Sequence, residues 1–293
     1  VFIKEGRVYN ERRNKLTTDR LLDIGLFKFV NIRVVQRPNN ILDHFINLTT
    51  YKTQSISGEL ELNNRQGNFL GTAGRVSYTN RNIFNGGERF DLSLSGGLET
   101  QFGDKQPLIN TSTIKLKGSV TFPSVILPFK AFRTNKNFIP KTFMSLSFNQ
   151  DTRVQFYSVR GARAQYGFRW NETRFKTSAF TPIDLNWLVL NSTTPEFDVE
   201  LRNDPRLALS FQTQLILSST YEYVYNRSDK YEPLNQTYFK GTIESAGNLL
   251  SLAIDGNAQD PGEVFGTPYS QYVRLIADVR KYYATDVGSV AMR

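Results

Sequence analysis

The stretch FDLSLSGGLETQF, from Phe90 to Phe102, constrains the fold of this chain more than any other. Its even-numbered positions are apolar except for Gly96 and Thr100, and its odd-numbered positions are polar or glycine. This alternation indicates a β-strand with one apolar face and one polar face. A tilted strand of about ten residues can cross a bilayer, and aromatic residues at the interfaces are typical of membrane strands. The stretch therefore predicts a membrane-spanning strand.

Similar alternation recurs along the chain from Thr53 onward, where no helix of any length is expected. We therefore expect a mostly β fold in which residues 51–293 form an antiparallel transmembrane β-barrel. Bacterial barrels close with an even number of strands, so we expect the closing strands to follow Arg293. The eleven expected strands are Ser55–Asn63, Leu70–Tyr78, Phe90–Phe102, Thr111–Phe122, Phe143–Tyr157, Gly161–Asn171, Thr181–Leu190, Phe211–Tyr225, Tyr238–Leu250, Ser270–Tyr283 and a last strand that begins at Gly288.

A soluble β-sandwich or jelly roll is the alternative fold. Most of the expected strands are longer than the usual length of about five or six residues. Aromatic residues make up 13% of the chain and cap the apolar faces of the strands, as in membrane barrels. The chain has a mean hydropathy of −0.40 and no run of about 18 apolar residues, which excludes a transmembrane helix. These features together favour the membrane barrel.

The net charge of +9 has two interpretations. The basic residues either belong to an ordinary solvated surface, or they form a cationic lumen or contact anionic lipid or an anionic polymer chain. The basic residues are spread along the chain, so no nucleic-acid partner is expected. Cysteine is absent and His44 is the only histidine, which excludes thiolate chemistry, a Ser-His-Asp triad in the barrel and a multi-histidine metal site. Glu59 and Glu61 project to one face, which we interpret as a solvated lumen wall. No catalytic, cofactor-binding or metal site is predicted, and the chain is not expected to be an enzyme.

Residues 1–50 follow a different pattern from the rest of the chain. Asn10 suits the N-cap of a helix, and Gly25 suits the position just after a helix end. A unit of this size is too short to bury a core alone. We therefore interpret it as the C-terminal part of a small α+β module whose first part precedes Val1. Its expected elements are a helix over Glu11–Ile24 and strands over Phe27–Val35 and Ile41–Leu48.

The segment from Thr18 to Ile32 combines a leucine-rich helix, a glycine and an alternating strand. In this it resembles the second helix and following strand of a POTRA domain in the Omp85 superfamily, which includes the BamA/TamA and surface-antigen D15-like proteins. The segment Asn80–Glu88 resembles the turn between the second and third barrel strands of that superfamily. Tyr166–Trp170 and Thr181–Asn186 resemble its TamA-like (TamL) branch in the Bacteroidetes.

One signature of the superfamily departs from its usual form here. That signature is Val or Ile, then Arg-Gly and an aromatic residue, on a long loop that folds into the lumen. Val159-Arg160-Gly161 is followed by Ala162 and lies too early in the chain. We interpret it as a coincidental turn between the fifth and sixth expected strands, and we expect the motif itself beyond Arg293.

The resemblance implies a barrel of about 16 strands when complete, set in the bacterial outer membrane with the N-terminal module in the periplasm. It implies a factor that inserts or translocates client outer-membrane proteins by adding their strands at a lateral gate, without any cofactor. Implied partners are the clients, membrane lipid and lipopolysaccharide, and a TamB-like periplasm-spanning protein or other subunits of an assembly complex.

The first expected strand supplies the candidate lateral gate, because its apolar face is slim and lacks an aromatic anchor. A passive outer-membrane porin or uptake channel is the alternative function, with lumen-facing charges that select solutes. A hydrolase embedded in the barrel is a third hypothesis, which the place of His44 outside the barrel disfavours. The candidate gate residues are Gln54, Ile56, Ser57, Gly58, Glu59, Leu60, Glu61 and Leu62, and the candidate lumen-facing charges are Arg163, Arg169, Arg274, Asp278 and Arg280.

Overall fold

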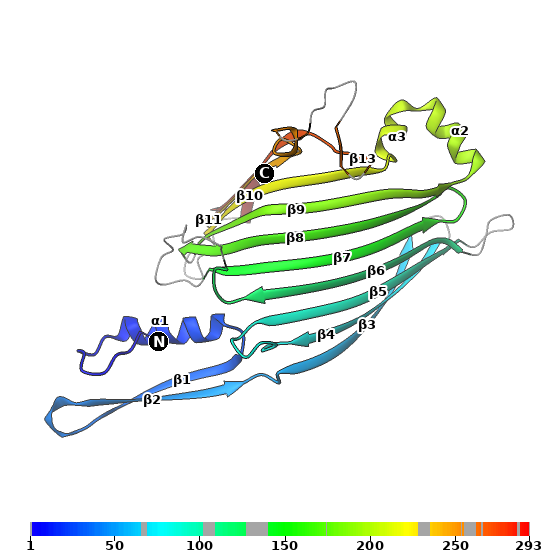
Figure 1. Ribbon diagram of the computed structural model, residues 1–293. Coiled ribbons are helices and arrows are strands. Elements are labelled where there is room, and N and C mark those ends of the chain that lie inside the picture. Colours follow the sequence, from blue (N-terminus) through cyan, green and yellow to red (C-terminus); the bar gives the residue numbers. More distant parts are fainter. Residues whose placement is uncertain are drawn as a thin grey trace.

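The computed structural model is dominated by one large antiparallel β-sheet, with a separate two-stranded sheet near the N-terminus (Figure 1). It describes residues 2–65, 69–101, 109–126, 140–173, 175–227, 235–252, 254, 262–264, 266–285 and 288–292. Phe102, the last residue of the stretch that predicts a membrane strand, lies outside these ranges. Among the described residues, no helix is both long and apolar enough to cross a membrane.

The large sheet has eleven strands, as predicted from the alternating segments. Each strand pairs with its neighbours in chain order, from β3 at one edge to β15 at the other, and the short hairpin of β12 (Glu263–Val264) and β13 (Thr267–Pro268) stands apart. The described part of the sheet therefore has two open edges. Its strands are β3 (Gln54–Arg65), β4 (Phe69–Asn80), β5 (Arg89–Gln101), β6 (Ile109–Phe122), β7 (Lys141–Arg153), β8 (Tyr157–Thr173), β9 (Lys176–Thr193), β10 (Gln214–Arg227), β11 (Asn235–Ala246), β14 (Tyr272–Thr285) and β15 (Gly288–Met292).

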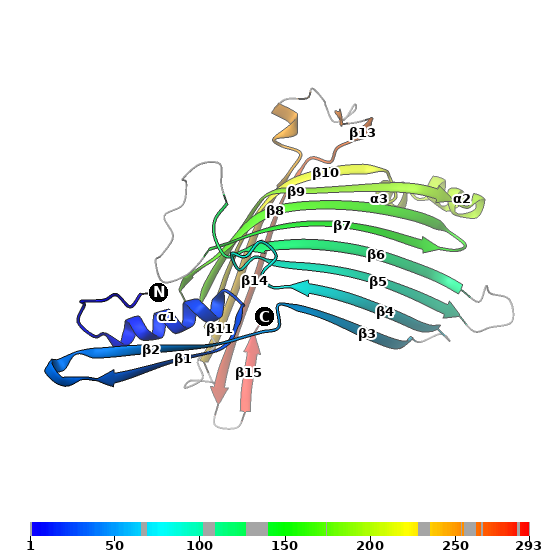
Figure 2. The same cartoon turned by 60° about the horizontal axis from the view of Figure 1, so that its bottom comes forward.

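The register of the ladder keeps the apolar positions of successive strands on one face. Leu94 of β5, for example, lies between Val76 of β4 and Leu116 of β6. The sheet curls into an open trough (Figure 2). Side chains crowd together on the concave side of a curved sheet, and the acidic side chains Asp184 and Glu244 of the polar face are buried. We infer that the polar face lines the inside of the trough and that the apolar face points outward.

The N-terminal unit contains the predicted helix and both predicted strands. Helix α1 (Glu11–Asp23) packs on β1 (Phe27–Gln36), which pairs with β2 (Leu42–Thr50). As predicted, Asn10 caps the helix by accepting a hydrogen bond from the Arg13 amide. The predicted role of Gly25 is also confirmed, because it follows the helix with a φ of 81°, where glycine is the least strained residue. Membership of these elements in a larger module stays a prediction.

The prediction that no helix follows Thr53 is wrong. Helices α2 (Pro195–Asn203) and α3 (Pro205–Ser210) join β9 to β10. Each begins with proline at its first position, and the preceding residue, Thr194 or Asp204, caps it through its side chain. These helices and the β1–β2 hairpin lie at opposite ends of the large sheet (Figure 1). We call the end beside α2 and α3 the rim, and the end beside β1 and β2 the base.

An aromatic cluster holds the two rim helices to the sheet. Phe211, just after α3, lies 4.6 Å from Tyr157 of β8 and 5.1 Å from Phe197 of α2, measured between ring centroids. Phe197 is only 4% exposed, so this contact is the centre of the cluster. The connection between β9 and β10 is therefore packed against the end of β8.

The predicted boundary between the fifth and sixth strands is also wrong. β7 ends at Arg153, and the turn comprises Val154, Gln155 and Phe156. Because these three residues continue the alternation of apolar and polar positions, they resemble part of a strand in the sequence. The Phe156 amide closes the turn by donating to the Arg153 carbonyl at 2.9 Å. The sequence Val159-Arg160-Gly161, interpreted above as a turn, lies inside β8 and pairs with β7.

Candidate functional site: the free edge of strand β3

Strand β3 forms one edge of the large sheet. All twelve of its residues pair with β4, from Gln54 opposite Asn80 to Arg65 opposite Phe69. In an antiparallel pair, alternate residues turn both backbone groups away from the partner strand. Roughly half the residues of β3 therefore present an N–H and a C=O group to the free side, and this row is a template for another strand.

The base of β3 is fixed by Arg81, which follows β4. Its guanidinium donates to the Lys52 carbonyl at 3.1 Å and to the Ser55 hydroxyl at 3.3 Å, and lies 5.2 Å from the centroid of the Tyr51 ring. Its amide donates to the Thr53 carbonyl at 2.8 Å. Because these contacts all lie at the start of the strand, β3 is anchored at its base and has a neighbour on only one side above that point.

The turn that carries Arg81 is held in one conformation by its own side chains. Asn82 accepts a hydrogen bond from the Gly87 amide at 2.8 Å, and Glu88 accepts one from the Gly86 amide at 2.8 Å. Gly87 has a φ of 88°, and a Cβ atom there would lie 3.0 Å from a methyl group of Ile24. The turn therefore packs against the end of helix α1 and links the N-terminal unit to the edge strand.

The apolar face of β3 is the most exposed part of the outer wall. The exposed fractions of Leu60 and Leu62 are 94% and 75%, against 53% for Leu94 in the interior strand β5. Leu60 leans over Gly74 of β4, where a Cβ atom would lie 3.5 Å from its terminal carbon. Leu60 and Leu62 also border a hollow of about 650 Å³ above Gly74 and Gly96. A strand added to β3 would cover the free side of these leucines.

The polar face of β3 carries the predicted pair of carboxylates, Glu59 and Glu61. The carboxylate of Glu59 lies 3.6 Å from the guanidinium of Arg75 on β4, and both side chains are more than half exposed. Glu61 accepts a hydrogen bond from Asn63 of its own strand at 3.0 Å. Across the ladder, Glu61 faces only the small side chain of Ala73. A hollow of about 190 Å³, bordered by both carboxylates, lies beside it.

Several carboxylates on interior strands are matched more closely, although among the described contacts Asp151 of β7 accepts only from the neutral amide of Asn149, at 2.7 Å. Asp184 of β9 accepts two hydrogen bonds from the Arg163 guanidinium, at 2.8 and 2.6 Å, and a third from Gln165 at 2.9 Å. Glu244 of β11 accepts hydrogen bonds from Arg274 and from the Tyr272 hydroxyl. These two arginines, both predicted as lumen-facing charges, are thus compensated by buried acids. Neither acid was singled out from the sequence, because cross-strand pairing depends on register.

The other predicted lumen-facing charges lie on the same polar face without forming one cluster. Arg280 donates to Asp278 of its own strand, with distances of 2.5 and 3.1 Å. Arg169 is exposed and faces Lys141 across the β7–β8 ladder. Lys141 in turn donates to the Asp23 carboxylate at 2.7 Å, which is a second link between the base of the sheet and helix α1. The structure therefore brings only Asp278 and Arg280 of this set into contact.

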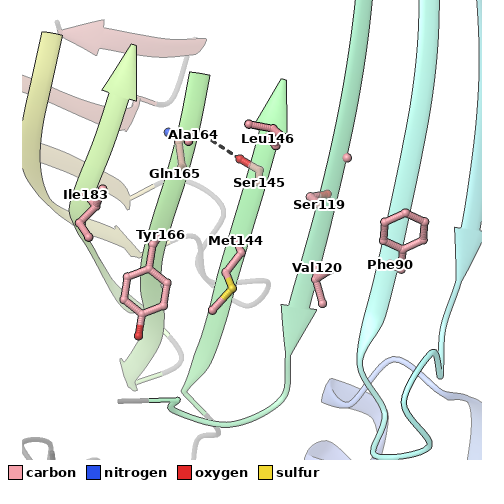
Figure 3. A pocket seen from close by; sticks show the side chains of 11 residues that line it. Phe90, Ser119, Val120, Met144, Ser145, Leu146, Ala164, Gln165, Tyr166 and Ile183 are labelled. Carbon is pink, nitrogen blue, oxygen red and sulfur yellow. Dashed lines mark hydrogen bonds between the residues drawn. The ribbon is translucent and has the colours of Figure 1, made fainter. Parts of the chain in front are cut away.

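A second hollow of the apolar face lies over β6 to β9 and has a volume of about 580 Å³ (Figure 3). Met144, Leu146, Tyr166 and Ile183 surround it, and the small residues Gly118 and Ala164 leave it open. The Tyr166 hydroxyl at its edge donates to the Ile126 carbonyl. Apart from this tyrosine, the side chains that surround the hollow on this face are apolar, so it fits hydrocarbon.

No protein-family model matches this chain, and no match was found among curated proteins. Among solved structures, one similar chain is BamA from Haemophilus ducreyi lacking POTRA domains 1–3. The two sequences are 12% identical, the match covers 99% of this chain and 75% of that chain, and the TM-score is 0.29. A likeness at this level assigns neither a family nor an activity to the chain.

Proposed function

We propose that this chain is an outer-membrane assembly factor of the Omp85 type, which adds strands of client β-barrel proteins to the free edge of β3. The observation that carries the proposal is the twelve-residue edge strand, anchored at its base by Arg81 and, within the described part of the sheet, flanked by β4 alone. Backbone hydrogen bonds to such an edge give affinity without demanding a particular client sequence. The proposed mechanism needs no cofactor and no catalytic residue.

The orientation of the molecule follows from the same proposal. The N-terminal unit would lie in the periplasm, with the base of the sheet at the inner interface and the rim helices at the cell surface. The POTRA-like segment and the turn Asn80–Glu88, both noted in the sequence, support this placement. Within the superfamily, the TamL branch is the narrower proposal, and it rests on the Tyr166–Trp170 and Thr181–Asn186 segments alone.

A passive channel is the competing function, and the polar face gives it less support. An anion-selective wall needs basic side chains whose charge is not already balanced. Arg163, Arg274 and Arg280 each form short ion pairs with a carboxylate. Three of the four predicted lumen-facing arginines are therefore balanced by acids, and Arg169, which faces Lys141, is the exception among the described residues.

Site-specific photocrosslinking in cells tests the proposal. Ser57 on β3, Ser77 on β4 and Ser93 on β5 lie opposite one another in one row across three strands. A crosslinking amino acid at Ser57 should trap newly made outer-membrane proteins. The same group at Ser93, two strands and roughly 10 Å away from the edge, should trap few or none. Equal trapping at both positions, or none at either, would refute strand addition at β3.

A further inference from the structure

Among the described residues, Glu59 and Glu61 on the edge strand lack the short ion pair that Asp184, Glu222 and Glu244 form on interior strands. Glu222 of β10, like Asp184 and Glu244, has a basic partner on the neighbouring strand, with the Lys240 ammonium 2.7 Å away. Among the side chains that the structure describes, Glu59 has only the 3.6 Å contact with Arg75, and Glu61 has only a hydrogen bond from the neutral amide of Asn63. An exposed ion pair at that distance contributes little.

The position of these carboxylates indicates which strand could supply basic side chains to pair with them. On the β4 side, Glu61 faces Ala73, and Arg75 of that strand lies opposite Glu59 instead. The other side of β3 is the free edge. A strand paired there would place alternate side chains directly opposite Glu59 and Glu61, with Cβ atoms about 5 Å apart. The hollow of about 190 Å³ beside both carboxylates leaves room for long side chains.

The apolar face of β3 adds a preference for a large apolar residue in the incoming strand. A residue between the two basic positions of the incoming strand would point outward, opposite Leu60. Leu60 is 94% exposed and its other side already rests on Gly74, so a large apolar side chain has an open surface to cover. The pattern basic–apolar–basic therefore complements Glu59, Leu60 and Glu61.

We propose that the edge of β3 selects client strands that carry Lys or Arg at two lumen-facing positions with a large apolar residue between them. This inference rests on the proposed function and adds a charge preference to it. The chain contains a strand of the same kind in its own interior, where Lys115, Leu116 and Lys117 of β6 alternate between the two faces. The pattern is thus compatible with a membrane strand.

Two synthetic peptides provide the test, used with the full chain in lipid nanodiscs and a photocrosslinker at Ser57. One peptide copies residues 109–121 of this chain, and the other has glutamate in place of both lysines. The lysine peptide should be captured about three- to tenfold more than the glutamate peptide, as expected for two exposed ion pairs. The preference should shrink in 1 M salt, where the screening length is about 3 Å.

Charge reversal at the edge supplies the decisive comparison. The double variant E59K/E61K should capture the glutamate peptide in preference to the lysine peptide. The variant E99K, which changes a carboxylate on β5 away from the edge, should keep the original preference. R75Q, which removes the only cation near Glu59 on β4, should strengthen capture of the lysine peptide.

The outcomes separate this inference from the proposed function. Equal capture of both peptides, unchanged by E59K/E61K, would overturn the charge preference and leave strand addition standing. Failure of both peptides to react at Ser57 would count against strand addition itself. Reaction of the Ser57 group only with a second copy of the chain would show that the edge serves self-association, and would overturn both.

Discussion

The buried carboxylate of Asp184 should contribute more to stability than the exposed carboxylates of the polar face. Its side chain is 10% exposed and receives three hydrogen bonds, two from Arg163 and one from Gln165. Hydrogen bonds to charged groups contribute about 1.5–3 kcal/mol in favourable cases. Arg163 is 50% exposed, so water can replace part of what it loses, and we expect Asp184→Ala to lower the unfolding free energy by about 2 kcal/mol.

The effect can be measured by urea unfolding of the protein in lipid vesicles. The two tryptophans of the chain, Trp170 and Trp187, lie on β8 and β9, so their fluorescence reports the strands that Asp184 joins. The midpoint should fall while the slope stays constant, because the surface exposed on unfolding is unchanged. Adding Arg163→Ala to Asp184→Ala should cost less than the sum of the two single changes.

Glu59→Ala is the matched control for this reasoning. Glu59 is also a carboxylate of the polar face with an arginine across the ladder, but it is 66% exposed and its pair measures 3.6 Å. Its removal should change the unfolding free energy by less than about 0.5 kcal/mol. If Asp184→Ala costs no more than Glu59→Ala, burial and geometry do not govern these ion pairs and the reasoning is refuted.

Two further predictions concern the base of the sheet. Arg81→Met removes the hydrogen bond to Lys52 and the contact with Tyr51. Backbone amides at the start of β3 should then exchange hydrogen at least tenfold faster, while those of β6 do not change. Unchanged exchange at β3 would show that Arg81 does not anchor the strand. Gly87→Ala places a methyl group against Ile24 at a residue with positive φ, and should lower the unfolding free energy by about 1–2 kcal/mol in the same urea assay. An unchanged unfolding free energy would mean that the turn is not packed as described.

The strands could be predicted from the sequence because alternation is a local property. The apolar and polar faces of Phe90–Phe102 can be recognised without knowledge of any other strand. The observed strands of the large sheet, from β3 to β15, lie at the expected segments. The order of the strands was equally accessible, since each one pairs with its neighbours along the chain. The ends of strands were harder, and Val154–Phe156 shows that a turn can continue the alternating pattern.

The rim helices were missed although their signals are present in the sequence. Thr194-Pro195 and Asp204-Pro205 each combine a capping residue with proline at the first helical position. Both helices are short, so periodicity gives no support, and the alternating strands on either side dominate the pattern. The same Thr-Pro pair at Thr181-Pro182 lies inside strand β9, so the capping signal alone does not locate a helix in this chain.

The candidate site was only partly accessible from the sequence. Glu59, Leu60 and Glu61 and the faces they occupy follow from alternation alone. The partners of Arg163 and Arg274 do not follow from alternation, because each partner lies on a neighbouring strand and is found only from the register, which in the β8–β9 ladder shifts between Tyr166 and Phe168. One extra residue in a strand exchanges the faces of everything beyond it, so cross-strand partners require the three-dimensional ladder.

The simple strand order of the large sheet has a consequence for growth. Within the large sheet, strands pair in chain order, and only the β12–β13 hairpin, which forms its own small sheet, intervenes between the paired strands β11 and β14. A further strand can therefore join the described sheet at β3 without breaking a single existing ladder hydrogen bond. Each addition forms backbone hydrogen bonds only along the edge strand. The sheet can therefore widen by one strand at a time while its interior ladders remain intact.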